Sequence, residues 1–333
     1  MEIFINVIIL IAGFTMLVKG ADWFVDSAAS LAKKIHVPEL VIGLTLVAFG
    51  TSAPELSVSL TSALKTASNG ITIGNVVGSN IMNIVLILGL TSVLCKIPCQ
   101  RNSLILDIPY MLMATILFIC LGYTGNQYSQ ADGIILVALL IVYIAILVVI
   151  SIKQKTNLFS EEDDDEIDSH ECATGFRRVI NRISDRAWFL IMLLLTGLAC
   201  VVYGSDLVVK SATSLAKYCG VSDRIIGLTM IALGTSLPEL VTSITAARKG
   251  KTDIAIGNII GSNIFNILCV AGVTACFVPV SFDGFLMDSI EALSAALILA
   301  ILCYLPGHAI RRWGGFVLLA FYIAFMAKTI MTI

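Results

Sequence analysis

The sequence predicts an all-α polytopic membrane protein of ten transmembrane helices, arranged as two inverted five-helix repeats. Composition, ten apolar runs and an internal repeat predict this fold class. Of the 333 residues, 58% are hydrophobic and 13% are charged, and the mean hydropathy is +0.95. Soluble domains are roughly 45–50% apolar and about 25% charged. The composition therefore excludes a soluble protein, and the balance of 21 basic against 23 acidic residues argues against nucleic-acid binding.

The apolar runs define the expected spans, because a membrane-crossing helix needs about 20 apolar residues. Five runs precede and five follow one long polar segment, 153–186. They lie near residues 3–20, 38–64, 71–95, 104–122, 132–152, 187–208, 224–247, 253–277, 285–305 and 313–331. We interpret the first run as a membrane helix and not a removed signal peptide, because it has no basic start and no clear cleavage site.

The distribution of Lys and Arg predicts the orientation. Loops on the side of segment 153–186 hold fifteen of these residues, and loops on the other side hold five. Basic loops stay in the cytoplasm, so we expect this segment to be cytoplasmic and both termini to be extracytoplasmic. The acidic run 161–171 within it lacks the ligand spacing of an EF-hand. We therefore interpret the segment as a solvated linker loop.

The two halves of the chain are copies of each other. Residues 43–63 match 227–247 at 13 of 21 positions, and residues 73–89 match 256–272 at 10 of 17. Five spans per half place the copies in opposite orientations, which is an architecture of secondary transporters with a substrate site near the midplane. The expected organisation is a first repeat (1–152, motif 43–89), the linker (153–186) and a second repeat (187–333, motif 227–272).

Each half carries a carboxylate inside a broken apolar span, in the sequences GTSAPE (50–55) and GTSLPE (234–239). Proline removes a backbone donor and clashes with the preceding turn. The residues expected to break the helices are Gly50, Pro54, Gly234 and Pro238. Glu55 and Glu239 follow directly, and because a charge inside the membrane costs roughly 2.5–3.5 kcal/mol, they are functional-site candidates.

Hydroxyl and amide side chains accompany each glutamate at helical spacing. Thr51 and Ser52 lie four and three residues before Glu55, and Ser79 and Asn83 are four apart in the next span. The second half repeats this pattern with Thr235, Ser236, Glu239, Ser262 and Asn266. An all-oxygen set of this kind suits a hard cation such as Ca²⁺ or Na⁺, and two carboxylates would neutralise one divalent ion.

Other polar residues in the spans have simpler interpretations. Asn83 and Asn266 could also join helices through hydrogen bonds. We expect four further amides to hold helix packing, namely Asn75, Asn80, Asn258 and Asn263. Carboxylates nearer the span ends are explained by solvation at the membrane interface: Asp22, Asp26, Asp107, Asp206, Asp288 and Glu291. The cysteines form no C-x-x-C pair, so a zinc or redox motif is not supported.

The segments GTSAPELSVS with GNVVGSNIMN, and GTSLPELVTS with GNIIGSNIFN, resemble the paired alpha-repeats of the cation/Ca²⁺ exchanger superfamily. The similarity is greatest to its sodium/calcium exchanger branch, including bacterial members, and it covers essentially the whole chain. The resemblance implies antiport of Ca²⁺ against Na⁺ by alternating access, with both ions as substrates and no cofactor. It also implies that the first span and its counterpart, near 187–208, slide against the other helices. We further expect a multi-pass protein of the plasma (inner) membrane that functions as a monomer.

The resemblance also implies which residues hold the ions. Ala48 and Ala232 join the hydroxyls, amides and carboxylates named above, and Glu55, Glu239, Thr51 and Thr235 are the metal ligands. Some relatives carry Asp where this chain has Asn266, which makes K⁺ co-transport an unlikely property here. The large regulatory domains of animal exchangers are absent, because the linker is too short to hold them.

Three other functions compete with Na⁺/Ca²⁺ antiport. A H⁺/Ca²⁺ or other cation/H⁺ antiporter would use the same glutamates as proton acceptors. An intramembrane enzyme is disfavoured, because the three histidines lie in or beside loops and no H-E-x-x-H motif exists. A passive channel fits the ligand set, but an inverted repeat with broken helices favours a gated carrier.

Overall fold

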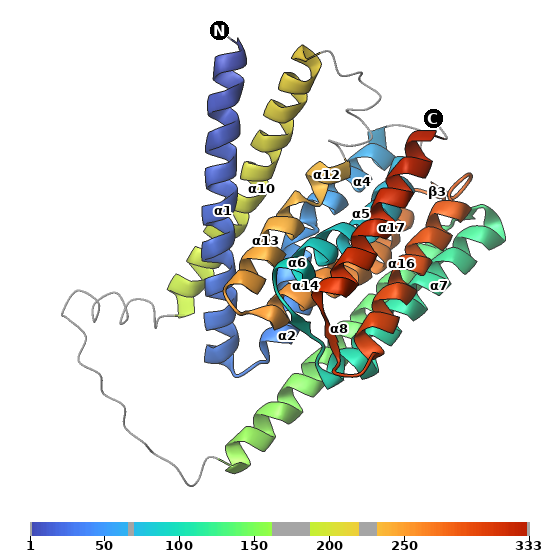
Figure 1. The fold of residues 1–333 in the computed structure, drawn as a ribbon. Coiled ribbons are helices and arrows are strands. Elements are labelled where there is room, and N and C mark those ends of the chain that lie inside the picture. Colours follow the sequence, from blue (N-terminus) through green and yellow to red (C-terminus); the bar gives the residue numbers. More distant parts are fainter. Residues whose placement is uncertain (1, 66–69, 162–186, 220–231, 332–333) are drawn as a thin grey trace.

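The computed structural model describes residues 2–65, 70–161, 187–219 and 232–331, which are overwhelmingly helical (Figure 1). The first half contains α1 (Glu2–Ile35), α2 (Glu39–Ile42), the π-helix η1 (Gly43–Val47), α3 (Ala48–Thr51), α4 (Ala53–Lys65), α5 (Gly70–Met82), η2 (Asn83–Leu88), α6 (Gly89–Leu94), β1 (Ile97–Pro98), η3 (Ser103–Asp107), α7 (Ile108–Gly125), β2 (Gln127–Tyr128) and α8 (Gln130–Glu161). The second half contains α10 (Ala187–Tyr218), α12 (Ala232–Thr235), α13 (Leu237–Arg248), α14 (Thr252–Phe265), η6 (Asn266–Ala271), α15 (Gly272–Phe277), β3 (Val280–Ser281), α16 (Leu286–Tyr304), β4 (Ala309–Ile310) and α17 (Arg312–Met331).

The described helices confirm a multi-pass membrane protein. Seven helical segments are long and apolar enough to cross a bilayer, and the bent pair 39–51 and 53–64 makes an eighth. The predicted span 224–247 lies partly outside the described residues, and α17 occupies the predicted range 313–331. The first helix begins and the last one ends at the same end of the bundle (Figure 1), as an even number of crossings requires.

Several predicted boundaries were wrong, and α1 is the clearest case. It continues to Ile35, well past the predicted end at residue 20. The prediction stopped where charged residues begin, but charge alone does not end a helix; a proline or a left-handed residue does. Here the helix ends before His36, which has φ 57°, and Pro38 follows two residues later. At the other end of the repeat, α8 extends to Glu161, so the predicted linker starts within a helix.

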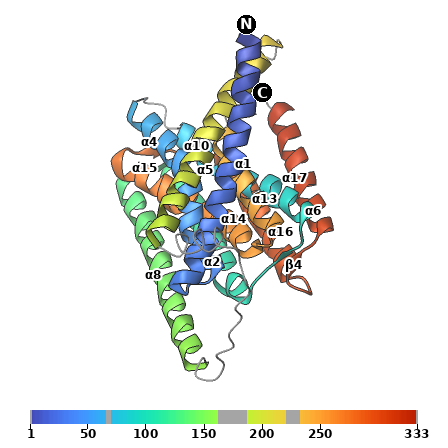
Figure 2. The same ribbon diagram turned by 90° about the vertical axis from the view of Figure 1, so that its left-hand side faces the viewer.

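Two short strand pairs show how the halves are related. β1 pairs with β4, and β2 pairs with β3, both antiparallel. Each pair joins the loop between the third and fourth spans of one half to the loop between the fourth and fifth spans of the other. This exchange occurs once at each end of the bundle, with β3 at the upper end and β4 at the lower end (Figures 1 and 2). An inverted two-fold relation between the halves produces that pattern.

The centre of the bundle is formed by the two spans that contain α5 and α14. In their apolar windows 78% and 89% of residues are buried, compared with 17% for α1 and 33% for α10. α14 also makes a close backbone contact with the first half, since a Cβ at Gly261 would lie 2.6 Å from the carbonyl oxygen of Leu44. Glycine at this position lets the two repeats approach each other at the centre.

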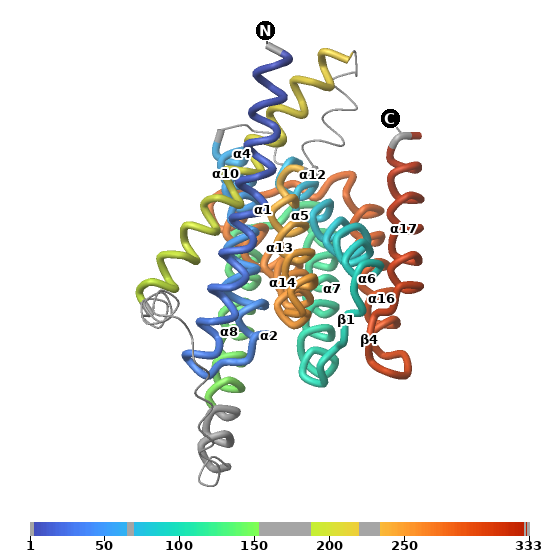
Figure 3. The backbone as a smooth tube through the Cα atoms, turned by 60° about the vertical axis from the view of Figure 1, so that its left-hand side comes forward, coloured from blue at the N-terminus to red at the C-terminus, as the bar shows by residue number. Residues whose placement is uncertain are grey.

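α1 and α10 form an antiparallel pair at the edge of the bundle (Figure 3). Glycines on both helices allow the backbones to touch, as is common between membrane helices. A Cβ at Gly20 would lie 2.6 Å from Cβ of Cys200, and one at Gly197 would lie 2.7 Å from the backbone nitrogen of Phe24. These two helices therefore pack mainly on each other and only on one side against the remaining helices.

Candidate functional site

Both glutamate-bearing spans are broken at the same place. Ser52 (φ −86°, ψ 3°) separates α3 from α4, and Ser236 (φ −89°, ψ 3°) separates α12 from α13. In each half the proline occupies the second position of the new helix, where a missing N–H is tolerated. The sequence therefore located the breaks within two residues, and the bend between 39–51 and 53–64 is 41°.

In the second half, a carbonyl freed by the helix break accepts a hydrogen bond from another helix. Pro238 cannot donate to the carbonyl of Gly234, which is four residues earlier. The hydroxyl of Ser205 on α10 donates to this carbonyl instead, at 2.9 Å. A freed carbonyl is thus satisfied by protein at membrane depth, as such a break requires.

The predicted site residues come together between the two halves. The hydroxyl of Ser52 donates to Oε1 of Glu239 at 3.2 Å, and Thr51 and Ser262 also face that carboxylate. In the mirrored arrangement Thr235 faces the carboxylate of Glu55. The remaining predicted residues have the following places: Ala48 opens α3, Ala232 opens α12, Ser79 lies in α5, and Asn83 and Asn266 begin η2 and η6.

This cluster is buried and rich in oxygen atoms without partners. Glu55 and Glu239 are at most 1% exposed, and their charges lie close enough to repel each other. Within the described part of the chain, no well-formed hydrogen bond reaches either oxygen of Glu55, Oε2 of Glu239, or the amide groups of Asn83 and Asn266. Buried polar groups are nearly always paired, so the excess of oxygen atoms here makes the cluster a candidate place for a cation.

Two asparagines that we expected to hold helix packing support the site directly. Asn75 donates to the backbone carbonyl of Glu55 (3.1 Å) and to Oγ of Ser59 (2.9 Å). Asn258 makes the equivalent contacts with the carbonyl of Glu239 (3.5 Å) and Oγ of Ser243 (2.9 Å). Asn258 also accepts a hydrogen bond from Thr51 at 3.0 Å, across the two halves. Their equivalent positions in the repeat were the signal that could have identified them.

Replacing Asn258 with Ala is therefore expected to weaken Ca²⁺ binding by about tenfold to a hundredfold, the usual effect of losing a residue that orients a metal ligand. The reason is that Thr51 and the carbonyl of Glu239 both lose their hydrogen bond with Asn258. Calcium titration of the purified protein measures this change. Asn102→Ala is the control, because Asn102 is an exposed helical residue directly before η3, in a segment that carries none of the proposed ligands. An equal loss in both variants would contradict the assignment.

The helix geometry changes at two further site residues. Asn83 begins the π-helix η2, and Asn266 begins the π-helix η6. Wider π-turns inside α-helices are rare and frequently occur at functional sites. η2 packs against α13 and η6 packs against α4, so each amide lies in the segment that contacts the glutamate helix of the opposite half.

A cavity of about 570 Å³ lies beside the site. It lies between α10, α4 and the start of α13, and its lining includes Pro54, Ser57, Asp206, Thr235 and Pro238. Pro54 and Pro238 directly precede Glu55 and Glu239 in the chain. The cavity therefore ends against residues next to the carboxylates, which are themselves buried.

One expectation about isolated carboxylates was wrong. Asp107 is 1% exposed and accepts a hydrogen bond from the hydroxyl of Tyr143 at 3.0 Å. It is therefore held by protein and not by interfacial water. The sequence could not show this, because Tyr143 lies on α8, another span.

The chemistry of the cluster is that of a hard-cation site. Its groups are carboxylates, amides, hydroxyls and backbone carbonyls, which are the ligands that Ca²⁺ and Na⁺ prefer. Among the described residues there is no cluster of three or more His, Cys, Asp or Glu side chains that would indicate a transition-metal centre. A buried oxygen site between inverted repeats, next to broken helices, defines a secondary transporter for cations.

Comparison with known proteins identifies the family within that class. The family model of the sodium/calcium exchanger protein matches residues 5–149 and 189–331. The chain is 36% identical to the sodium/calcium exchanger MaX1 of Methanosarcina acetivorans, over 97% of each chain, and 34% identical to the inner membrane protein YrbG of Escherichia coli, over 96% of this chain and 95% of that one. The protein belongs to the sodium/calcium exchanger family.

A solved structure agrees with this assignment. The sodium-calcium exchanger NCX_Mj, soaked with 10 mM Na⁺ and no Ca²⁺, superposes with a TM-score of 0.80 at 31% identity. The match covers 98% of this chain and 99% of that chain. The predicted fold class, ten helices in two inverted repeats, is therefore confirmed.

Proposed function

We propose that this chain is a secondary active antiporter that exchanges Na⁺ for Ca²⁺ across the membrane by alternating access. The observation that carries the proposal is the group of unpaired carboxylate and amide oxygens buried between the two inverted halves. Membership of the sodium/calcium exchanger family supports the same pair of ions. The cavity beside Pro54 and Pro238 supports a carrier, because alternating access opens the site to one side at a time.

The two glutamates supply the charge for Ca²⁺. Their combined charge of −2 balances one divalent ion, and without a cation their mutual repulsion in a buried site is unfavourable. Thr51 and Thr235 complete the metal ligands through their oxygen atoms. The other proposed ligands are Ser52, Ser236, Ser79, Ser262, Asn83 and Asn266, with the carbonyls of Ala48 and Ala232.

Sodium would compete for the same oxygens. Two or more Na⁺ ions can replace one Ca²⁺ only if the carboxylates are shared, so binding of either ion excludes the other. Because positions 83 and 266 both carry Asn, the site holds no third carboxylate. We therefore infer a site without the extra negative charge that K⁺ co-transport would call for.

The orientation and assembly follow from the sequence pattern. Fifteen Lys and Arg on the side of segment 153–186 support a cytoplasmic location for that face, with both termini outside. Much of that segment, including most of the acidic run, lies outside the described residues. The complete site lies within one chain, which supports a functional monomer organised as repeats 1–152 and 187–333 with the linker between them.

Transport into proteoliposomes tests the proposal. The purified protein is reconstituted, and ⁴⁵Ca²⁺ uptake is measured with internal Na⁺, Li⁺, K⁺ or a proton gradient, applied one at a time. We expect uptake with internal Na⁺ alone, accelerated by an inside-positive potential if more than two Na⁺ move per Ca²⁺. Uptake driven only by the proton gradient would replace this function with the competing H⁺/Ca²⁺ antiport, while the two-glutamate site would remain.

A further inference from the structure

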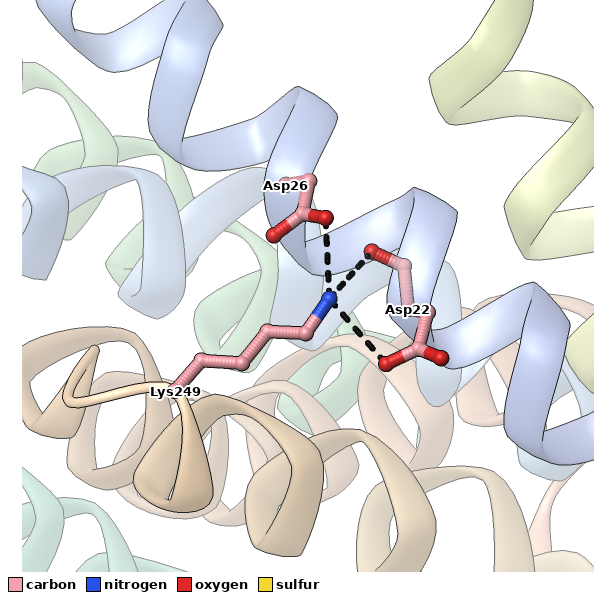
Figure 4. Close-up of polar contacts among 3 residues, drawn as sticks. All are labelled: Asp22, Asp26 and Lys249. Carbon is pink, nitrogen blue, oxygen red and sulfur yellow. Dashed lines mark hydrogen bonds and ion pairs between the residues drawn. The ribbon is translucent and has the colours of Figure 1, made fainter.

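A cluster of three charges joins α1 to the end of α13 (Figure 4). The amine of Lys249 lies 3.0 Å from Oδ1 of Asp22 and 2.9 Å from Oδ2 of Asp26, and it also donates to the backbone carbonyl of Asp22 at 3.2 Å. Partial burial alone would lower the pKa of Lys249, but its contacts with Asp26 and Asp22 outweigh burial and raise it. Lys249 is therefore positively charged at any physiological pH.

The cluster connects two peripheral helices to the rest of the bundle. α1 and α10 pack mainly on each other, and their apolar windows are buried to only 17% and 33%. Lys249 follows α13, which carries Glu239 and belongs to the central helices. The ion pair thus fastens the peripheral α1–α10 pair to the helix that holds half of the ion site.

The cluster and the cavity lie on opposite sides of Glu239. The cavity touches α13 at Pro238, at the start of the helix. Lys249 lies ten residues beyond Glu239, which is about 15 Å along a helix. In this structure the cavity therefore lies at the start of α13, next to Glu239, while α1 is fastened to the bundle at the far end of the same helix.

We propose that Lys249, Asp22 and Asp26 form a latch that closes the Lys249 side of the ion site while the cavity side is open. Movement of the α1–α10 pair that opens the Lys249 side must separate these charges. The latch thereby sets the equilibrium between the two access states, which goes beyond the proposed exchange function and rests on its alternating access.

The second half of the repeat does not carry the same three charges, so the latch has no equivalent on the cavity side. The residues equivalent to Asp22, Asp26 and Lys249 are Asp206, Lys210 and Lys65. Where the first half has a second carboxylate, the second half has Lys210, which pairs with Asp206 on the same helix at 2.7 Å. An equivalent latch on the cavity side would have one carboxylate, already held by a neighbouring lysine. The charge pattern therefore favours the cavity-open state.

Hydrogen–deuterium exchange of the protein in lipid nanodiscs tests the latch without requiring transport. In Lys249→Gln, deuterium uptake is expected to rise in the end of α13 and in residues 19–33 of α1, and to fall around the cavity at 53–58 and 202–209. Removing a partly exposed ion pair should shift the ratio of the two states by roughly twofold to fivefold. The double variant Asp22→Asn, Asp26→Asn should reproduce the shift, and Lys249→Arg should retain most of the wild-type pattern.

The matched control is Lys251→Gln. Lys251 lies two residues after Lys249, and its side chain is about as exposed. Its partner at 3.0 Å is Glu39 of α2, so this ion pair does not hold α1. We expect no fall in uptake around the cavity in this variant. A rise confined to the neighbourhood of residue 249, or the same reciprocal change in Lys251→Gln, would overturn the latch. Since no ion flux is measured, that result is distinct from a failure of the proposed exchange.

Discussion

Replacing either Glu55 or Glu239 with Gln is expected to abolish Ca²⁺ transport and to lower Ca²⁺ affinity by more than about a hundredfold, beyond the usual effect of losing a residue that only orients a ligand. Glutamine keeps the size of the side chain but removes one of two charges that face each other in a buried site. A single carboxylate leaves a bound divalent ion with an uncompensated charge. Calcium uptake into proteoliposomes and calcium titration of the purified protein measure the two effects.

Thermal unfolding separates loss of the ion from loss of the fold. A ligand that binds the native state stabilises it by RT ln(1 + [L]/Kd), about 2.7 kcal/mol at a concentration of 100 times Kd. We expect Ca²⁺ to raise the Tm of the wild type but not that of Glu55→Gln or Glu239→Gln. In the absence of Ca²⁺ both variants should be at least as stable as the wild type, because one repulsive charge is gone.

Glu39→Gln is the matched control for these variants. Glu39 is a partly buried glutamate in the same half, but it pairs with Lys251 and takes no part in the cluster. It should retain transport and the Ca²⁺-dependent rise in Tm. Wild-type transport rates in Glu55→Gln or Glu239→Gln would disprove the site assignment.

Gly261→Ala is expected to destabilise the protein by about 2 kcal/mol, typical of overpacking, and to weaken Ca²⁺ binding at the same time. The added methyl group would lie 2.6 Å from the carbonyl oxygen of Leu44 and 2.7 Å from Cβ of Ala48. Backbone cannot rotate away as a flexible side chain can, so α14 and the segment that precedes Thr51 must move apart. Because Ser262 follows directly on α14, the displacement reaches the proposed ligands.

Thermal unfolding with and without Ca²⁺ checks this prediction. Gly125→Ala, at the end of α7, is the control, because no atom lies within 4 Å of its added methyl group. That variant should keep the wild-type Tm and Ca²⁺ response. If Gly261→Ala also keeps both, the close approach of the two halves is not what holds the site together.

The fold could be predicted from the sequence to the level of spans and repeats. Hydropathy predicts the membrane helices because apolar side chains face the lipid. The internal repeat, with five spans in each half, predicts that the two halves have opposite orientations in the membrane. Hydropathy does not predict the extension of α1 to Ile35, because charged residues such as Lys19 and Asp22 interrupt the apolar run. The strand pair β1–β4 was also beyond prediction, because it depends on loops that are far apart in the chain.

The sequence predicts the chemical groups of the candidate site but not the hydrogen bonds that hold them in place. Glu55 and Glu239 were identifiable because charge inside an apolar span is costly and each appears in the same context twice. The roles of Asn75 and Asn258 depend on which helices face each other, and spacing along one helix does not give that information. The same limit applies to Asp107 with Tyr143 and to Lys249 with Asp22, whose partners belong to other segments.

Calcium binding at increasing Na⁺ concentration tests most directly the central claim that both ions use one site between Glu55 and Glu239. Isothermal titration of the purified protein with Ca²⁺ is repeated at several Na⁺ concentrations, with choline holding the ionic strength constant. We expect the apparent Kd for Ca²⁺ to rise with Na⁺ while the number of Ca²⁺ sites stays the same. We expect Glu239→Gln to bind Ca²⁺ more than about a hundredfold more weakly than the wild type at each Na⁺ concentration. A Kd for Ca²⁺ that does not change with Na⁺ would contradict a shared site.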